Sequence, residues 1–336
     1  MRAVTCDGHG GVEVLRISEV PRPEPGPHEV LVRVRAAALN RADLVQRSGE
    51  YKPPPGVSPI LGVEIAGEVD SWGGEVTGFA RGQQVFGIVG GGGYAEYCPL
   101  DAGMAIPVPA GWSFVEAVAV PEVFVTADTL LFELGQLQAG ETVLIHAGAS
   151  GVGTACIQLA RHAGARVLCT VGSAEKARRC RELGADEAID YKRHDFAEEV
   201  RRVTSGASGA SEAAGVDVVA DCVGVSYFER NVALLKPGGR LVCIGLLDHQ
   251  VRERAQLDFL DLVLRRIQIK GSALRPRSLA DKRAICRRFA ERWLPLLAAG
   301  TLQPVIDSVF PLEEVARAHE RMEANLNVGK VLLTLD

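Results

Sequence analysis

The fold is decided by residues 142–155, which read TVLIHAGASGVGTA. An apolar run leads into a turn of small residues, and the turn opens an amphipathic segment at 151–163. Small residues let the backbone approach a pyrophosphate closely, and the first turn of a helix offers free N–H donors and a positive dipole end. The simpler alternative is a strand-to-helix turn with no ligand. We predict a strand, a helix and between them a phosphate-binding turn made by Ser150, Gly151, Val152 and Gly153.

The end of the next predicted strand indicates which dinucleotide binds. Residues 166–171 (RVLCTV) are followed by Gly172 and Ser173, without the acidic residue that accepts hydrogen bonds from the ribose 2′-OH in an NAD site. Lys176 follows closely, and a cation beside a hydroxyl suits a 2′-phosphate. Glu175 opposes this reading unless its side chain faces solvent, and Lys176 could itself be an ordinary solvated helix residue. The pattern favours NADPH.

His146 lies next to the turn, where it could be considered as a general base. A histidine that ends a buried strand is more often a hydrogen-bonded packing residue. We therefore do not include it among the candidate catalytic residues.

The pattern of elements changes near residue 123. Before it, short strands are interrupted by Pro- and Gly-rich turns, which is typical of a barrel-like β domain. After it, apolar strands alternate with amphipathic helices, which predicts a parallel sheet covered on both faces, and the tail from 305 to 336 returns to strands. The sequence thus predicts an α/β protein in which a cofactor domain, 123–273, is inserted into a β-rich domain made of 1–122 and 274–336.

Composition excludes several classes of protein. The 336 residues carry 37 Lys and Arg against 42 Asp and Glu, a net charge of -5, so nothing favours nucleic acid or an anionic membrane as partner. No apolar run reaches the about 18 residues of a membrane span, and the first residues do not resemble a signal peptide. We expect a cytoplasmic globular protein. The small, polar segment 204–211 reads as a surface loop.

The eight cysteines do not indicate a metal or disulfide framework. They include no CxxC pair and no histidine at finger-like spacing, and most stand in apolar runs. We expect buried free thiols and no bound metal.

Several motifs resemble one family. Residues 139–148, the Asp221-Cys222-Val223-Gly224 turn and residues 235–240 are similar to those of the medium-chain dehydrogenases/reductases. Residues 38–44 and 49–56 resemble its zinc-free quinone oxidoreductase branch. The resemblance runs along the whole chain. It implies a GroES-like catalytic domain, a Rossmann cofactor domain with a doubly wound parallel sheet, NADPH in a cleft between them, and a homodimer that pairs the sheet edge near 267–271.

The resemblance also implies site residues. Asn40 and Tyr51 match positions at the nicotinamide and substrate end, where they are the candidate catalytic residues, although Tyr51 could serve packing alone. Asn40 is also expected to bind cofactor, since it could orient either the nicotinamide carboxamide or a substrate carbonyl. The remaining matches bind cofactor: Thr126 beside the nicotinamide, the turn 150–153, Ser173, Lys176 and Tyr191 at the adenosine phosphate, Ile244, Gly245 and Leu246 bordering the nicotinamide, and Asn325 from the tail.

Two departures from the family pattern matter. Ser150 stands where many members of this branch have a third loop glycine, and its hydroxyl either donates to a phosphate or is simply tolerated. Val45 stands where some members have a tyrosine, which predicts a wider and less polar substrate pocket. Asp43 we expect to be a structural acid paired with Arg41 or Arg47.

The same region constrains the chemistry. Zinc-dependent relatives place a Cys in the segment matching 40–43 and a His just before Glu64, whereas this chain has Asn40-Arg41-Ala42-Asp43 and Val63. Without those ligands a catalytic zinc has no site. Quinones and α,β-enones spread the charge left by a hydride over a conjugated system, so they need positioning more than a Lewis acid.

Three functions follow from these expectations. The first is hydride transfer from NADPH to a quinone in a metal-free cleft. The alternative is an NADPH-dependent enone or alkenal double-bond reductase. A non-enzymatic NADPH-binding regulator is the third reading.

Overall fold

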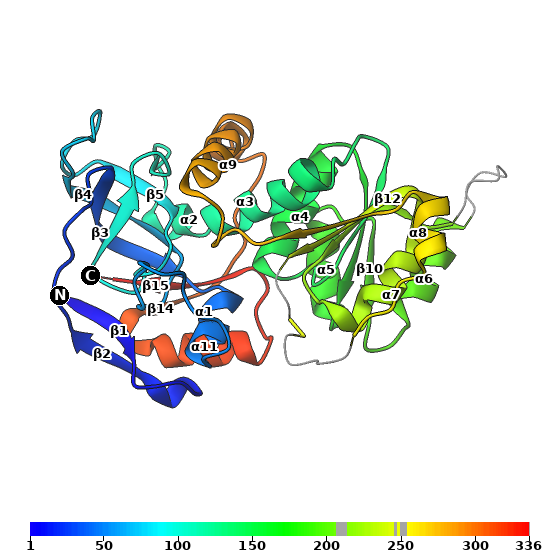
Figure 1. The fold of residues 1–336 in the computed structure, drawn as a ribbon, viewed down its shortest axis with the longest axis horizontal. Helices are drawn as coiled ribbons and strands as arrows, with labels where there is room; N and C mark the ends of the chain where they lie inside the picture. Colours follow the sequence, from blue (N-terminus) through cyan, green and yellow to red (C-terminus); the bar gives the residue numbers. More distant parts are fainter. Residues whose placement is uncertain (206–213, 245–246, 249–253, 336) are drawn as a thin grey trace. The chain divides into compact units, whose positions relative to one another are not determined.

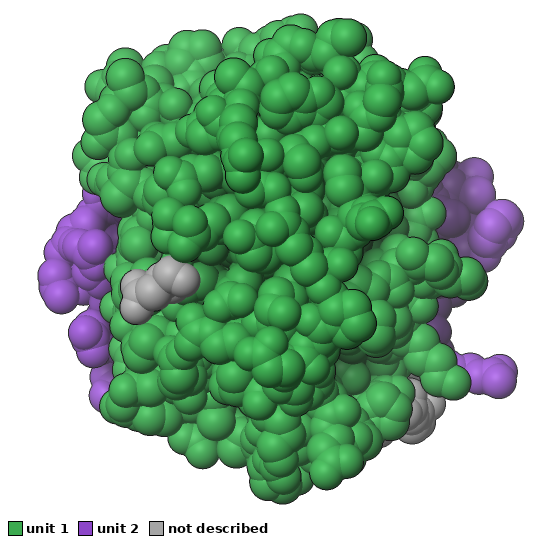
Figure 2. All heavy atoms as spheres, turned by 90° about the vertical axis from the view of Figure 1, so that its left-hand side faces the viewer, with its two compact units in different colours: residues 1–125, 275–336 green, residues 126–274 purple. Residues whose placement is uncertain are grey.

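A computed structural model of the chain describes residues 1–205, 214–244, 247–248 and 254–335. The chain forms two compact units, Met1–Val125 with Arg275–Asp336 and Thr126–Leu274 (Figures 1 and 2). The expected domain limits at 122/123 and 273/274 lie near these boundaries and remain predictions. Gly245, Leu246 and most of the loop predicted at 204–211 lie outside the described residues.

The first unit is built on a seven-stranded sheet. Its strand order is β14-β15-β3-β4-β5-β7, and β6 pairs with β3. The pairs are antiparallel except for β14 with β15. Figure 1 shows the C-terminal β15 beside the early strand β3. The strands are β3 (Glu29–Ala38), β4 (Glu64–Trp72), β5 (Gln84–Ile88), β6 (Tyr97–Asp101), β7 (Ile106–Pro107), β14 (Ile306–Pro311) and β15 (Lys330–Thr334), with a separate hairpin of β1 (Arg2–Cys6) and β2 (Leu15–Glu19).

Alternation explains the central strand of this sheet. In β3, Val30, Val32, Val34 and Ala36 are buried, while Arg33 is exposed and Arg35 half-buried. The alternation that the sequence predicts therefore holds for residues 32–36, whereas Leu31, Ala37 and Ala38 are buried as well, so the ends of the strand are covered on both faces. The helical segments of the unit are η1 (Val12–Val14), α1 (Arg41–Arg47), α2 (Phe114–Val118), α9 (Leu279–Arg292), α10 (Leu294–Ala298), η3 (Leu312–Glu314) and α11 (Val315–Glu323), and α3 (Pro121–Asp128) leads into the second unit.

The second unit is a six-stranded parallel sheet with the order β10-β9-β8-β11-β12-β13. The order reverses between β8 and β11, and in open parallel sheets ligands bind beyond the carboxyl ends of the strands at such a point. The strands are β8 (Thr142–Ile145), β9 (Arg166–Val171), β10 (Glu187–Asp190), β11 (Val216–Asp221), β12 (Leu235–Ile244) and β13 (Gln268–Ser272).

Helices cover both faces of this sheet, as predicted. On one face Phe196 and Val200 from α6 (Phe196–Thr204) and Val232 from α7 (Val225–Leu234) pack against Leu144 and Val219 of the strands. Right-handed crossovers from β8 to β9 and from β9 to β10 place α4 and α5 on the other face. The remaining helical segments are η2 (Thr129–Leu134), α4 (Gly151–His162), α5 (Ala174–Glu182) and α8 (Phe259–Arg265).

A buried arginine fixes the loop that leads into β8. Arg240 on β12 donates from Nη1 and Nη2 to both carboxylate oxygens of Glu141 at 2.9 and 2.6 Å. It also donates to the carbonyl oxygens of Gly135 at 2.8 Å and Gln136 at 3.1 Å. Because Arg240 is 8 % exposed, these groups depend on one another for hydrogen bonding.

Replacement of this arginine tests that dependence. Arg240→Met leaves the Glu141 carboxylate and two carbonyl oxygens without their donor, so we expect the free energy of unfolding to fall by about 3 kcal/mol in urea denaturation. The control is Arg202→Met, which breaks a more exposed pair with Glu199 and should cost less than about 1 kcal/mol. Equal losses in the two variants would contradict the role given to Arg240.

Candidate functional site

The turn after β8 has the geometry of a tight strand-to-helix connection. Ala147 adopts a left-handed conformation with φ 51°. Ser150 is the N-cap of α4, and its Oγ accepts a hydrogen bond from the Gly153 N–H at 3.0 Å. The Ser150 hydroxyl therefore has a structural role in the helix, and its own hydrogen stays available to donate to a ligand.

Two glycines make this turn possible. A Cβ atom on Gly153 would lie 2.3 Å from the Ala147 carbonyl oxygen and 2.6 Å from that of Gly148. A Cβ on Gly148 would lie 2.8 Å from the Cys169 sulfur on β9. A side chain on Gly153 would push the start of α4 away from the turn, and one on Gly148 would push the turn away from β9, so the two glycines allow this close packing. Gly151 and Val152, between Ser150 and Gly153, are half-buried.

His146 is a packing residue in this structure. It is 1 % exposed; its Nδ1 lies 3.0 Å from Thr170 Oγ1 and its Nε2 lies 2.7 Å from Asn231 Oδ1. Burial lowers the pKa of His146 to about 4, so the ring is neutral near pH 7. Because Asn231 Oδ1 can only accept, Nε2 carries the proton and Nδ1 accepts from the Thr170 hydroxyl. Both ring nitrogens are thus engaged, in agreement with the structural role predicted for His146.

The residues predicted for the adenosine phosphate meet at the end of β9. Ser173 caps α5, its Oγ accepting from the Lys176 N–H at 3.2 Å. Tyr191 donates its backbone N–H to the Val171 carbonyl at 3.1 Å, and its hydroxyl lies over Gly172, where a Cβ would be 2.9 Å from it. Glu175 is exposed, as the NADPH prediction requires.

A second lysine here was missed in the sequence. Lys192 Cε lies 3.4 Å from the place of a Cβ on Gly172, so this side chain also borders the end of β9. A signal was present: Lys192 follows β10, and the carboxyl ends of neighbouring parallel strands meet at one edge of a sheet. The side chains of Tyr191 and Lys192 thus border this point, next to Ser173 and the backbone of Lys176.

Asp221 ends β11, next to β8 at the reversal of strand order. Its Oδ1 accepts from the Val223 N–H at 2.7 Å, while its buried Oδ2 has no hydrogen-bond partner within the described part of the chain. Burial raises the pKa of Asp221 to about 6. The sequence motif contained Asp221, but its place at the reversal of strand order could be known only from the order of the strands in the sheet.

Two residues predicted to border the nicotinamide lie in the second unit. Ile244 ends the neighbouring strand β12, and Thr126 is buried on α3.

The candidate catalytic residue Asn40 is held in a polar cluster of the first unit. Its Nδ2 donates to Glu64 Oε1 at 2.8 Å, and its Oδ1 accepts from Lys330 Nζ at 2.9 Å. Lys330 also donates to Glu64 Oε1 at 2.6 Å. Sequence reasoning did not single out Lys330, and Glu64 entered it only as the neighbour of a possible zinc ligand.

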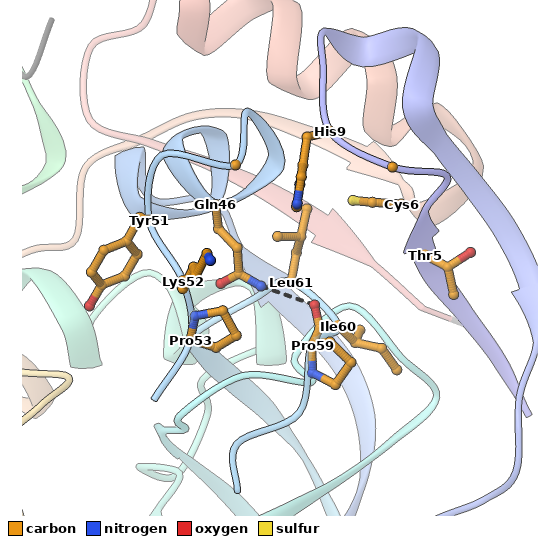
Figure 3. A pocket seen from close by; sticks show the side chains of 12 residues that line it. Thr5, Cys6, His9, Gln46, Tyr51, Lys52, Pro53, Pro59, Ile60 and Leu61 are labelled. Carbon is orange, nitrogen blue, oxygen red and sulfur yellow. Dashed lines mark hydrogen bonds between the residues drawn. The ribbon is translucent and has the colours of Figure 1, made fainter. Parts of the chain in front are cut away.

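Tyr51 borders a pocket of about 340 Å³ in the same unit. Cys6, Gln46, Lys52 and Leu61 are among the other residues that line it (Figure 3). The guanidinium of Arg275 lies 5.3 Å from the centre of the Tyr51 ring, and it also donates to Gln46 Oε1 at 2.7 Å. Tyr51 therefore has both an open side and a packing partner.

Asp43 and Asn325 have partners in the structure that the sequence did not indicate. Asp43 is a buried structural acid, but it pairs with neither Arg41 nor Arg47: its carboxylate accepts from Tyr94 Oη at 3.0 Å and from the backbone N–H groups of Asn40 and Gly62. The prediction failed because the sequence does not show that β-sheet folding brings Tyr94 to this place. Asn325, just after α11, accepts from Arg41 Nη2 at 2.7 Å.

The donor set at Asn40 and Glu64 does not fit a zinc ion. The group that contacts both side chains is the ammonium of Lys330, which donates hydrogen bonds and has no lone pair to offer a metal. Among residues 1–205, 214–244, 247–248 and 254–335, no three His, Cys, Asp or Glu side chains are grouped to hold a metal. In the same residues no helix is long and apolar enough to cross a membrane.

Comparison with known proteins matches both units. The alcohol dehydrogenase GroES-like domain matches residues 26–110, and the zinc-binding dehydrogenase domain matches residues 151–288. The chain is 36 % identical over 97 % of its length, and 97 % of the other, to a quinone oxidoreductase of Pseudomonas aeruginosa.

Solved structures show the same fold over the whole chain. Escherichia coli quinone oxidoreductase complexed with NADPH superposes with a TM-score of 0.88, at 28 % identity and full coverage of both chains. The CurK enoyl reductase superposes with a TM-score of 0.85, at 27 % identity, covering 100 % of this chain and 99 % of the other. The chain belongs to the medium-chain dehydrogenase/reductase family, in its quinone oxidoreductase branch, with a GroES-like domain and a Rossmann-type cofactor domain.

Proposed function

We propose that this oxidoreductase transfers a hydride from NADPH to a quinone. The observation that carries the cofactor assignment is the end of β9, where Ser173, Lys176, Tyr191 and Lys192 gather. The homologous quinone oxidoreductases support the reaction class. When bound, NADPH supplies the hydride, and the residues of this chain bind and orient the two reactants.

The turn after β8 would hold the pyrophosphate. The first turn of α4 has free backbone N–H groups at Gly151 and Val152, and Ser150 keeps a hydroxyl hydrogen to donate. Gly148 and Gly153 keep side chains out of this space. Thr126 and Ile244 would border the nicotinamide with Gly245 and Leu246, and Asn325 would contribute from the tail.

The end of β9 would hold the 2′-phosphate of NADPH. Ser173 and Tyr191 offer hydroxyl groups, and Lys176 and Lys192 offer positive charge. The exposed Glu175 does not oppose this, because solvent screens its charge. A dianionic phosphate gains charge-assisted hydrogen bonds here that a ribose hydroxyl cannot use fully.

Asn40 and Tyr51 would act at the acceptor end. The Asn40 amide is half-buried and firmly oriented, and Tyr51 borders an open pocket. Both can donate a hydrogen bond to a carbonyl oxygen as negative charge builds up on it, and the final proton would come from solvent. Such a site suits an acceptor that delocalises charge.

An enone or alkenal double-bond reductase is the second candidate. The similarity to an enoyl reductase favours it, and the pocket beside Tyr51 would accept either kind of acceptor. A non-enzymatic NADPH-binding regulator is the third. We also propose that the protein is cytoplasmic and that it has no nucleic-acid partner.

One steady-state assay tests the proposed reaction. NADPH oxidation is followed by absorbance with 1,2-naphthoquinone, with an alkenal and with NADH in place of NADPH. We expect turnover of the quinone, a preference for NADPH, and no loss of rate after dialysis against a chelator. Turnover of the alkenal alone would favour the double-bond reductase, and tight NADPH binding without turnover would favour the regulator. Loss of activity on chelation with recovery in zinc would contradict the metal-free site.

Charge reversal at Lys176 tests the cofactor assignment. Lys176→Glu places a carboxylate beside the 2′-phosphate, so the KM for NADPH should rise by about 10- to 100-fold while that for NADH changes little. Lys192→Glu should act in the same direction. The control is Arg287→Glu, at an exposed position on α9 of the other unit, which should change neither KM. Equal weakening of both cofactors by Lys176→Glu would contradict the NADPH assignment.

We also propose a homodimer formed through the edge of the parallel sheet. β13 is the last strand of the order, and α8 beside it has no buried residue. Phe259, Leu260 and Leu264 of α8 are 65–73 % exposed, and Ile269 of β13 is 38 % exposed. An apolar helix next to an uncovered strand edge indicates an interface, because both features favour association.

Charged substitutions on α8 test this interface. Phe259→Asp with Leu264→Asp should convert the dimer to a monomer in light scattering after size exclusion, because charges cannot be buried there without partners. Leu279→Asp, at an exposed apolar position on α9, should leave the mass unchanged. A wild-type monomer, or a dimer that survives the double substitution, would contradict the proposed interface.

A further inference from the structure

A lysine is buried where three strands of the first unit meet. Lys330 begins β15, Glu64 begins β4, and Asn40 follows the end of β3. Both β4 and β15 run antiparallel to β3, so their first residues meet the end of β3. The fold thus brings together residues that are 24 to 290 positions apart.

Each hydrogen of the lysine ammonium has an acceptor. Lys330 Nζ donates to the Leu39 carbonyl oxygen at 2.8 Å, to Asn40 Oδ1 at 2.9 Å and to Glu64 Oε1 at 2.6 Å. The side chains of Lys330 and Glu64 are 3 % and 0 % exposed. A positive charge is therefore fixed at this place and cannot itself reach a ligand.

Asn40 is the member of this group that can. It is half-buried, whereas Lys330 and Glu64 are buried. The ammonium on one side and the carboxylate on the other determine the orientation of the amide: Oδ1 faces Lys330 and Nδ2 faces Glu64. One Nδ2 hydrogen bonds to Glu64 at 2.8 Å, while the one other acceptor of Nδ2 among the described residues is the Ala38 carbonyl at 3.4 Å. That second hydrogen is weakly held.

We infer that Lys330 is a positioning residue for the reduction, holding and polarising the Asn40 amide so that its weakly held N–H donates to the carbonyl oxygen of the acceptor. The inference rests on the proposed function. Zinc-dependent relatives are expected to stabilise this oxygen with a metal, and here a lysine acts through an amide. Asn40 Oδ1 accepts a hydrogen bond from the positively charged Lys330 ammonium, which draws electrons from the amide nitrogen and strengthens its N–H as a donor.

The step leaves the protein unchanged in protons and electrons. The hydride, with its two electrons, passes from NADPH to the conjugated system of the acceptor, and NADP⁺ remains. Negative charge moves to the acceptor oxygen, which receives the Asn40 hydrogen bond and then takes a proton from solvent. Lys330 and Asn40 keep their protons throughout.

Comparing an enone with a quinone distinguishes a positioning role of Lys330 from a purely structural one. The enolate formed from an enone holds more charge on its oxygen than a hydroquinone anion, whose formation also gains aromaticity. Loss of the polarised donor should therefore slow enone reduction more than quinone reduction. A defect in folding or NADPH binding would slow both equally, so the ratio of the two kcat/KM values reports the inferred role.

The experiment compares this ratio in the holoenzyme and its variants. Lys330→Met combined with Glu64→Gln removes the charge pair without leaving a buried carboxylate alone. Asn40→Ala keeps the pair and removes the donor. We expect either change to lower kcat/KM for the enone about 10- to 100-fold more than for the quinone, through kcat, with the KM for NADPH unchanged. Lys330→Arg, which keeps the positive charge, should keep the ratio close to that of the wild-type enzyme.

A matched ion pair elsewhere between β3 and β4 provides the control. Arg35→Met with Glu68→Gln removes the pair that Arg35 forms with Glu68 at 2.9 Å and should leave the ratio unchanged. If the Lys330 double variant does not fold, Asn40→Ala decides alone. A wild-type ratio in Asn40→Ala would overturn the inference, while a wild-type protein that reduces neither acceptor would overturn the proposed function and the inference with it.

Discussion

The first unit depends on the ion pair between Lys330 and Glu64. Both side chains are buried, and each would be costly to bury without the other. Lys330 comes from the last strand of the chain and Glu64 from an early one, so the pair forms only when β15 has joined the sheet beside β3. The same contact orients Asn40, which means that the stability of the unit and the geometry of its candidate site share one interaction.

The second unit depends on a steric constraint. Helix α4 starts so close to the turn after β8 that Gly153 cannot carry a side chain, and the turn lies so close to Cys169 of β9 that a side chain on Gly148 would clash with it. This approach exposes the first backbone N–H groups of α4 at the carboxyl edge of the sheet, beside the reversal of strand order between β8 and β11. The residues near the end of β9 add charge at the same edge. The proposed site for a dinucleotide phosphate thus follows from packing that the sheet already requires.

Sequence reasoning succeeded where the signal was local. The strand, turn and helix at 142–163 and the buried role of His146 were predicted from short stretches, whereas the helix-capping role of Ser150 was not. It failed where partners are distant: Asp43 was assigned to Arg41 or Arg47, which are two and four residues away in the same helix, whereas its partners include Tyr94, 51 positions away. Lys192 was missed because its relevance arises from strand neighbours rather than from its own segment.

The sequence by itself determined the class of each unit, the strand, turn and helix at 142–163 and the lack of thiolate or imidazole ligands at Asn40 and Glu64. These are properties of residue type and of periodicity over a few residues, which do not depend on the rest of the chain. Only the tertiary structure decided that Lys330 would stand between Asn40 and Glu64, because strand order sets which strand ends meet across 266 and 290 positions. The hydrogen bonds among Asn40, Glu64 and Lys330 depend on the order of the strands in the sheet, and no short stretch of sequence encodes that order.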